Sequence, residues 1–228
     1  MGYTKRIVCL ANSVKIGGLC IAGKEVIKGG YGGWVRPVSA RPSAEVKLEE
    51  CWYENRQTPR LLDNVDIRMV KAKPDLHQTE NHVIETGCCW EKSGTLPWGD
   101  LDDLVDEPVP LWIDGEHTFS GLNDCVAEAQ AATLTNSLVL IKPKKVTIQV
   151  GVEGGIYKKR AVRAYFKHCR MEYGLKVTDP GADAAFRAKG DGSYSLRDVF
   201  LCVSLTEPYE MDHRCHKLVA AIISNTPF

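Results

Sequence analysis

The order of elements in the second half of the chain constrains the fold more than any other feature. Residues 137–152 predict a strand, because valine and isoleucine alternate with polar residues and glycine over 146–152. A Glu-Gly-Gly turn follows, and 156–168 alternate in the same way, which predicts a long basic hairpin. Residues 173–177 predict a short third strand.

A single helix comes next. Asp179 before a proline is typical of a helix start, and Gly190 marks the end of a helix over about 182–189. Apolar runs at 199–205 and 218–223 predict two closing strands. The order of three strands, one helix and two strands is that of the OB-fold, a five-stranded Greek-key barrel that commonly binds oligonucleotides or oligosaccharides.

The first half is also rich in predicted strands, over 5–11, 25–39 and 65–72, and its glycines suit bulges or sharp barrel corners. A short helix is expected over 123–132. We therefore expect a mainly β protein with short helices and two OB-like small β-barrels. The expected domains are 1–135, which includes an acidic connecting segment over about 96–128, and 136–228 with the order β-β-β-α-β-β.

Charge is balanced over the whole chain but not along it. Lys plus Arg and Asp plus Glu both number 29, which argues against a protein that coats nucleic acid indiscriminately. Residues 1–41 and 142–170 are strongly basic, with Glu25 and Glu153 as their only acids, whereas 96–128 hold no Lys or Arg. If the blocks do not interleave in space, they form distinct faces, and a basic face is typical of phosphate binding.

Other protein classes are disfavoured by composition. No apolar run approaches the roughly 18 residues of a membrane-spanning helix, and residues 1–10 lack the apolar stretch of a signal peptide. The nine cysteines include no CxxC pair, so we expect reduced and mostly buried thiols rather than a disulfide framework or zinc ribbon. The sequence predicts a cytoplasmic protein with no membrane partner and no cofactor.

Several short segments resemble the dual OB-containing domain family of prokaryotes. They are Arg6-Ile-Val-Cys-Leu-Ala-Asn-Ser13, Gly33-Trp-Val-Arg-Pro-Val-Ser39, His77-Gln-Thr-Glu-Asn81, Leu175-Lys-Val-Thr-Asp-Pro180 and Lys217-Leu-Val-Ala-Ala221. The resemblance covers nearly the whole chain in order, and His216 departs from it where an aromatic residue is expected. It implies two OB-like barrels and a nucleic-acid-sensing role in conflict or defence systems.

The leading hypothesis is a non-enzymatic module that binds single-stranded or structured nucleic acid, or a nucleotide-like ligand, and acts through an effector protein. Cations at strand spacing with an aromatic residue can track phosphates and stack a base. No catalytic residue is predicted. The candidate binding residues are Lys15, Lys24, Trp34, Arg36, Lys158, Arg160, Arg163, Tyr165 and Lys167.

Polar residues beside the basic strands form a second group of candidates. Their amide, carboxylate and hydroxyl groups could line a pocket or read a base edge. They are Asn12, Ser13, Ser39, Gln78, Glu80 and Asn81.

Two other functions stay open, a metal-dependent phosphoester hydrolase and a protein-interaction adaptor. The hydrolase would use His77, Glu80 and His82 as metal ligands, although their spacing matches no known ligand motif. The adaptor would dock a basic partner on the acidic residues around 100–107. The GxxxxGK stretch at 18–24 is not expected to bind a nucleotide as a P-loop, since Glu25 replaces the Ser or Thr and glycines at 29 and 30 preclude a following helix.

Overall fold

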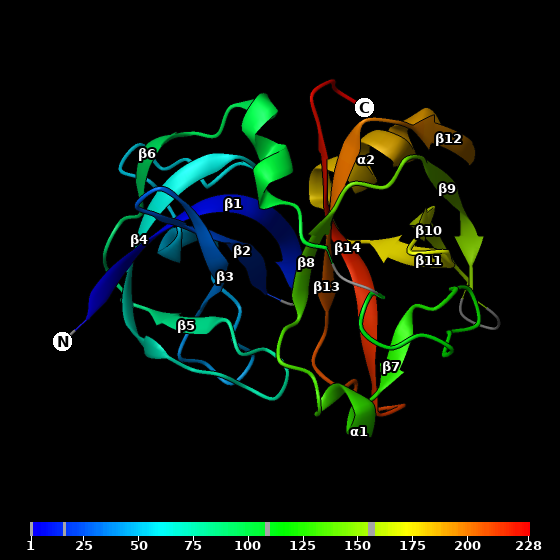
Figure 1. The fold of residues 1–228 in the computed structure, drawn as a ribbon, viewed down its shortest axis with the longest axis horizontal. Coiled ribbons are helices and arrows are strands. Elements are labelled where there is room, and N and C mark those ends of the chain that lie inside the picture. The colour runs from blue at the N-terminus through cyan, green and yellow to red at the C-terminus, as the bar shows by residue number, and fades with distance from the viewer. Residues whose placement is uncertain (1, 16, 108–109, 155–157) are drawn as a thin grey trace. The chain divides into compact units, whose positions relative to one another are not determined.

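A computed structural model describes residues 2–15, 17–107, 110–154 and 158–228. Strands dominate it, and helices are few and short, which confirms a mainly β protein (Figure 1). Contacts divide the chain into two compact units, unit 1 (Met1–Leu104) and unit 2 (Val105–Phe228). In the described part of the chain, none of the helices has the length and apolar character of a membrane span.

Unit 1 is a strongly bent sheet whose pairings run in a ring. The strand order is β1-β2-β3-β5-β4-β6, and a further pairing joins β4 back to β1. Alternating residues of these strands, among them Ile7 and Ile67, form one buried core, and Trp90, just before β6, packs in it. The elements of unit 1 are β1 (Tyr3–Lys15), β2 (Gly18–Ile27), β3 (Gly30–Val38), the 3-10 helix η1 (Leu48–Glu50), β4 (Asp63–Ala72), β5 (Asn81–Ile84), β6 (Glu91–Thr95) and the 3-10 helix η2 (Trp98–Leu104).

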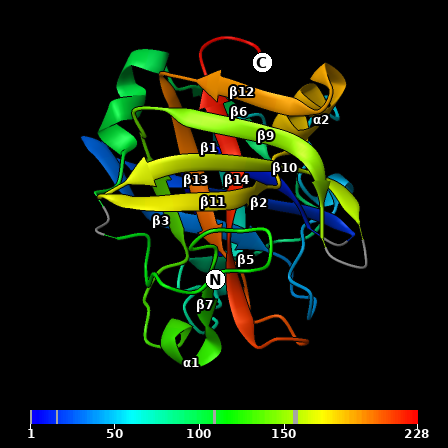
Figure 2. The same cartoon turned by 90° about the vertical axis from the view of Figure 1, so that its right-hand side faces the viewer.

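Unit 2 is built on the sheet order β12-β9-β10-β11-β14-β13-β8, and β7 pairs with the far end of β14. Figure 2 shows β12, β9, β10 and β11 side by side. Its elements are β7 (Cys125–Ala127), α1 (Glu128–Ala131), β8 (Leu138–Ile141), β9 (Val146–Glu153), β10 (Lys159–His168), β11 (Met171–Val177), α2 (Pro180–Lys189), β12 (Gly192–Leu196), β13 (Val199–Leu205) and β14 (Arg214–Ser224).

The two units share one topology. Three antiparallel strands, β1-β2-β3 in unit 1 and β9-β10-β11 in unit 2, are joined by a fourth and a fifth, β4 and β5 in unit 1 and β13 and β14 in unit 2. The fifth pairs in parallel with the third: β5 with β3, and β14 with β11. Unit 2 also contains β7, β8 and β12. The fifth strand then pairs with the fourth, β5 with β4 and β14 with β13. This is the order expected of the OB-fold, and it occurs twice.

The structure differs from the predicted elements at several places. The strand expected over 137–152 is two strands, β8 and β9, because Pro143 has no N–H to donate to a sheet. Strand β12 was not predicted, since its sequence Gly-Ser-Tyr-Ser-Leu has little apolar character. The helix expected over 123–132 is the three-residue β7 followed by the four-residue α1.

The boundary between the units falls after Leu104, whereas the sequence placed it near Thr135. The acidic segment that follows Leu104 packs on unit 2. Leu111 lies in the core of that unit, and the Leu140 N–H donates a 2.8 Å hydrogen bond to a carboxylate oxygen of Asp106. A run of acids and prolines looks like a linker in sequence, but these contacts make part of it an edge of unit 2.

Helix α2 begins where the sequence predicted, because Asp179 caps it. One Asp179 oxygen accepts hydrogen bonds from the N–H groups of Gly181 and Ala182, and the other accepts from the Ile222 N–H of β14 at 2.9 Å. The carboxylate is buried, so the same side chain both starts the helix and attaches it to the sheet.

Differences in thiol burial make a direct test of the fold. Cys9 and Cys51 are fully buried, and burial raises the pKa of each to about 12, whereas Cys89 and Cys169 are exposed. Because only the accessible thiolate reacts, we expect an aromatic disulfide reagent at about pH 8 to modify Cys89 and Cys169 far faster. Peptide mapping by mass spectrometry measures this. Labelling of Cys9 as fast as Cys89 in the folded protein would contradict the packing of unit 1.

Candidate functional site

The outer face of the sheet in unit 2 carries the strongest candidate site. Strand β10 alternates, so that Val162 and Phe166 enter the core while Arg163, Tyr165 and Lys167 lie on the opposite side, as the sequence predicts. The flanking strands pair antiparallel with it in continuous register, β9 on one edge and β11 on the other. Side chains from these strands therefore stand in rows across the outer face.

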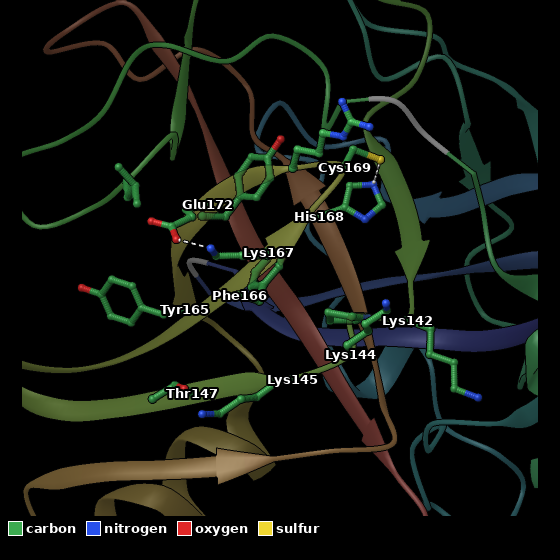
Figure 3. Close-up of a pocket in the computed structure, with 14 residues that line it drawn as sticks. Lys142, Lys144, Lys145, Thr147, Tyr165, Phe166, Lys167, His168, Cys169 and Glu172 are labelled. Carbon is green, nitrogen blue, oxygen red and sulfur yellow. Dashed lines mark hydrogen bonds and ion pairs between the residues drawn. The ribbon is translucent and has the colours of Figure 1, made fainter.

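A hollow of about 720 Å³ opens where this sheet ends at the turn between β10 and β11, and residues of the outer face and of the core both line it (Figure 3). We call it the basic hollow, because Lys and Arg side chains line it and Glu172 is the only carboxylate among its described lining residues. Its cations are Lys142, Lys144, Lys145, Lys167 and Arg170, and its aromatic residues are Tyr165, Phe166 and Tyr173.

The segment between β8 and β9 supplies three of the lysines. The Lys142 ammonium lies 4.6 Å from the centre of the Phe200 ring and 3.6 Å from an Asp198 oxygen, which restrains this lysine. Lys144 and Lys145 are exposed, and neither forms an ion pair with any residue that the structure describes. Pro143 thus ends one strand and leaves two free cations at the rim of the hollow.

The turn between β10 and β11 forms another part of the rim of the basic hollow. Cys169 and Arg170 both have positive φ, +49° and +70°, in a two-residue connection between antiparallel strands. This is the geometry of a tight hairpin turn that usually needs Gly or Asn, so two ordinary side chains are held in an unfavourable conformation. The Cys169 Sγ lies 3.3 Å from Nε2 of His168. Arg170 is exposed beside them.

Aromatic rings form the apolar part of the basic hollow. Phe166 and Tyr173 stack with their ring centres 5.5 Å apart, and the Tyr173 hydroxyl donates to Asp114 at 2.9 Å, which fixes that pair in the core. Tyr165 lies on the outer face and is partly exposed, and burial raises the pKa of its hydroxyl. Its ring is therefore neutral and accessible, as stacking on a base requires.

Arg163 was predicted to bind phosphate, but in the structure its guanidinium is hydrogen-bonded to other groups of the protein. It forms a two-point ion pair with Glu153, both distances being 2.9 Å, and Nη1 also donates to Asp124 at 3.3 Å and to the Gly174 carbonyl at 2.7 Å. Only 4% of the residue is exposed. Arg163 therefore braces the sheet beneath the site rather than offering a free cation.

The other predicted cations of unit 2 are dispersed. Lys167 lines the basic hollow and pairs with Glu172 at 2.9 Å, both side chains remaining well exposed. Lys158 and Arg160 lie at the opposite end of β10 and do not line the hollow, and Arg160 pairs with Asp191 at 2.8 Å. Among the predicted residues of unit 2 that the structure describes, Tyr165 and Lys167 thus line the basic hollow and the others do not.

The predicted cations of unit 1 are mostly buried. The Lys24 ammonium lies 5.7 Å from the centre of the Trp34 ring on the paired strand, and only 9% of Lys24 is exposed. Arg36 is buried and forms a 3.2 Å ion pair with Glu80. Lys15 ends β1, and its side chain is outside the described part of the chain.

The predicted polar pocket is brought together only in part. The Asn81 side chain accepts from Arg36 at 3.4 Å and donates to Gln78 at 3.3 Å, so these residues and Glu80 form one buried network.

The remaining polar candidates contact other groups. Asn12 donates to the Pro59 carbonyl at 2.8 Å, and Ser39 accepts from the Arg41 backbone at 3.3 Å. Ser13 is buried in β1.

The metal-ligand alternative gains no geometric support. His77 is fully buried, whereas His82 lies on β5 with its Nδ1 2.6 Å from the Tyr3 hydroxyl, and burial lowers the pKa of His82. Among the described residues, no group of three or more His, Cys, Asp or Glu could hold a metal ion. The GxxxxGK stretch lies within β2 and opens no helix, as expected.

Sequence reasoning did not single out Lys142, Lys144, Lys145 and Arg170, which provide most of the charge of the basic hollow. Their signal was present in the basic block 142–170. A single strand over 137–152 would leave no exposed segment around Pro143, so these lysines become candidates only once β8 and β9 are seen to be separate strands.

Comparison with known proteins agrees with the repeated topology. The family model of the dual OB-containing domain matches residues 5–222, nearly the whole chain. No curated protein and no solved structure matches the sequence. With two units of one strand order and a family match across both, the chain belongs to the dual OB-containing domain family.

Proposed function

We propose that unit 2 is a non-enzymatic binding module for nucleic acid or a nucleotide-like ligand, and that the basic hollow is its site. One observation carries the proposal: cations from two separate segments and a strand converge on a hollow with an accessible aromatic ring. The cations can pair with phosphates and the ring can stack on a base, so a nucleotide is the ligand that would contact both.

Charge distribution supports the same ligand class. The chain as a whole is neutral, so the cations of this hollow are a local concentration rather than part of a basic surface everywhere. Such a local field attracts polyanions to one place. Membership in a family built on OB-folds agrees, because these folds commonly bind oligonucleotides on their sheet face. A sensing role in prokaryotic defence, with an effector protein as partner, extends this proposal.

Fluorescence anisotropy tests it directly. Labelled single-stranded DNA, single-stranded RNA and duplex are titrated with the protein from about 50 to 200 mM salt, where released counterions set the slope. About four phosphate contacts predict a log–log slope of about −3 for a single strand, or roughly 60-fold weaker binding across this range. Absence of binding to all three probes, with folding confirmed by circular dichroism, would overturn the proposal.

A further inference from the structure

A second hollow lies on the same outer face, next to the basic hollow. It measures about 360 Å³, and its described lining includes Gln149, Ser193 and Gly151 but no Lys or Arg. Its carboxylate, Glu153, is held in the ion pair with Arg163. This neutral hollow suits a base or sugar better than a phosphate, because amide and hydroxyl groups can bond base edges.

Tyr165 lines both hollows. It lies in the middle of the face, directly opposite Thr147 on β9 and Gly174 on β11. A ligand that extends from the basic hollow into the neutral hollow must therefore pass over the Tyr165 ring.

Gly174 determines how that ring lies. A Cβ placed on Gly174 would be 2.7 Å from Cε1 of Tyr165 and 3.1 Å from its Cδ1, so the ring occupies the space where any side chain would be. The Tyr165 ring packs against the β11 backbone because residue 174 has no side chain. Three hydrogen bonds hold the Gly174 backbone. Its carbonyl accepts from Nη1 of Arg163 at 2.7 Å and from the Leu122 N–H at 3.2 Å, and its N–H donates to the Leu122 carbonyl at 2.9 Å.

We infer that the ligand is a single strand several nucleotides long, with phosphates in the basic hollow, a base stacked on Tyr165 and the next nucleotide in the neutral hollow. Gly174 is the positioning residue that seats the stacking ring. A mononucleotide would fill one hollow only, and a duplex would keep its bases inside and away from the ring. This inference rests on the proposed function and narrows it.

Tyr165→Ala and Tyr165→Phe test the stacking step with a labelled thymidine octanucleotide, (dT)8, as the probe. Base–aromatic stacking is sequence-tolerant and strong, so we expect Tyr165→Ala to weaken binding at least 10-fold with an unchanged salt slope. Tyr165→Phe keeps the ring and is expected to restore affinity to within about twofold. Lys144→Ala/Lys145→Ala is the comparison variant. Because it removes two phosphate contacts, it should make the salt dependence of (dT)8 binding less steep.

Gly174→Ala tests the positioning step. The added Cβ must displace the Tyr165 ring, so we expect weaker (dT)8 binding in the wild-type background and no further loss in Tyr165→Ala. A merely structural role for Gly174 would cost the same affinity in both backgrounds.

The outcomes separate this inference from the proposed function. Loss of binding in the lysine variant with full binding by Tyr165→Ala would leave the basic hollow as the site and overturn the stacking path. Competition by thymidine monophosphate as strong as by (dT)8, or equal binding of an 8-base-pair duplex, would also overturn the inference. If neither variant changed binding, the hollow itself would not be the site.

Discussion

Replacing Lys144 and Lys145 together with alanine is expected to weaken single-stranded nucleic-acid binding about 30-fold at about 50 mM salt. The two ammonium groups are exposed at the rim of the basic hollow, so each contact to phosphate is made without breaking an internal ion pair. A contact of this kind contributes about 1 kcal/mol, and two of them correspond to about 30-fold in Kd. Anisotropy titration of the labelled octanucleotide measures the change.

The salt slope of the same variant is a second and independent readout. Each lost phosphate contact makes the log–log slope less steep by roughly 0.7, so the slope should change from about −3 to about −1.6. Since both side chains are exposed, the free energy of unfolding should change by less than about 0.5 kcal/mol.

A matched lysine pair provides the control. Lys158 and Lys159 are also adjacent, exposed and part of unit 2, but they lie at the other end of β10 and do not line the hollow. Lys158→Ala/Lys159→Ala is expected to change affinity less than about threefold, through the long-range field alone. Equal losses in the two double variants would mean that affinity comes from overall charge, and that the hollow is not a site.

Much of the fold was predictable because many of its elements have local sequence signals. Alternation over 146–152 and the Asp-Pro start of α2 mark elements that need only their own residues, and both are present in the structure. Strand β12 was missed because its place at the sheet edge depends on pairing with β9, which Ser193 and Ser195 do not signal. Unit 1 gave a weaker pattern, as glycines interrupt its strands.

The site was predictable only in part, because pairing between charges is a tertiary property. The sequence places Arg163 on the correct face of β10, but it cannot show that Asp124, 39 positions earlier, lies 3.3 Å from the guanidinium. Arg36 is similar, since its partner Glu80 lies 44 positions later in the chain, just before β5. Conversely, Lys144 and Lys145 stay available to a ligand because neither forms an ion pair with an acid of the described chain. A cation's availability therefore follows from the fold.

Arg163→Ala is expected to destabilise unit 2 strongly. The guanidinium bonds Glu153, Asp124 and the Gly174 carbonyl at once, and its removal leaves the Asp124 carboxylate, with 7% of its side chain exposed, without that cation. Breaking one side of a buried ion pair in this way costs about 3–5 kcal/mol. Urea unfolding followed by circular dichroism measures the loss, and faster hydrogen exchange in β10 and β11 locates it.

Arg160→Ala is the control for that prediction, because Arg160 lies on the same strand as Arg163 and forms a single exposed pair with Asp191, just before β12. Exposed pairs contribute less than about 1 kcal/mol, so the two variants should differ by at least about 2 kcal/mol. A folded Arg163→Ala protein of wild-type stability, but with a smaller salt slope for (dT)8, would show instead that Arg163 contacts phosphate. The observed hydrogen bonds favour a loss of stability. A guanidinium that already donates to two carboxylates and a carbonyl has few N–H groups free to bind a ligand.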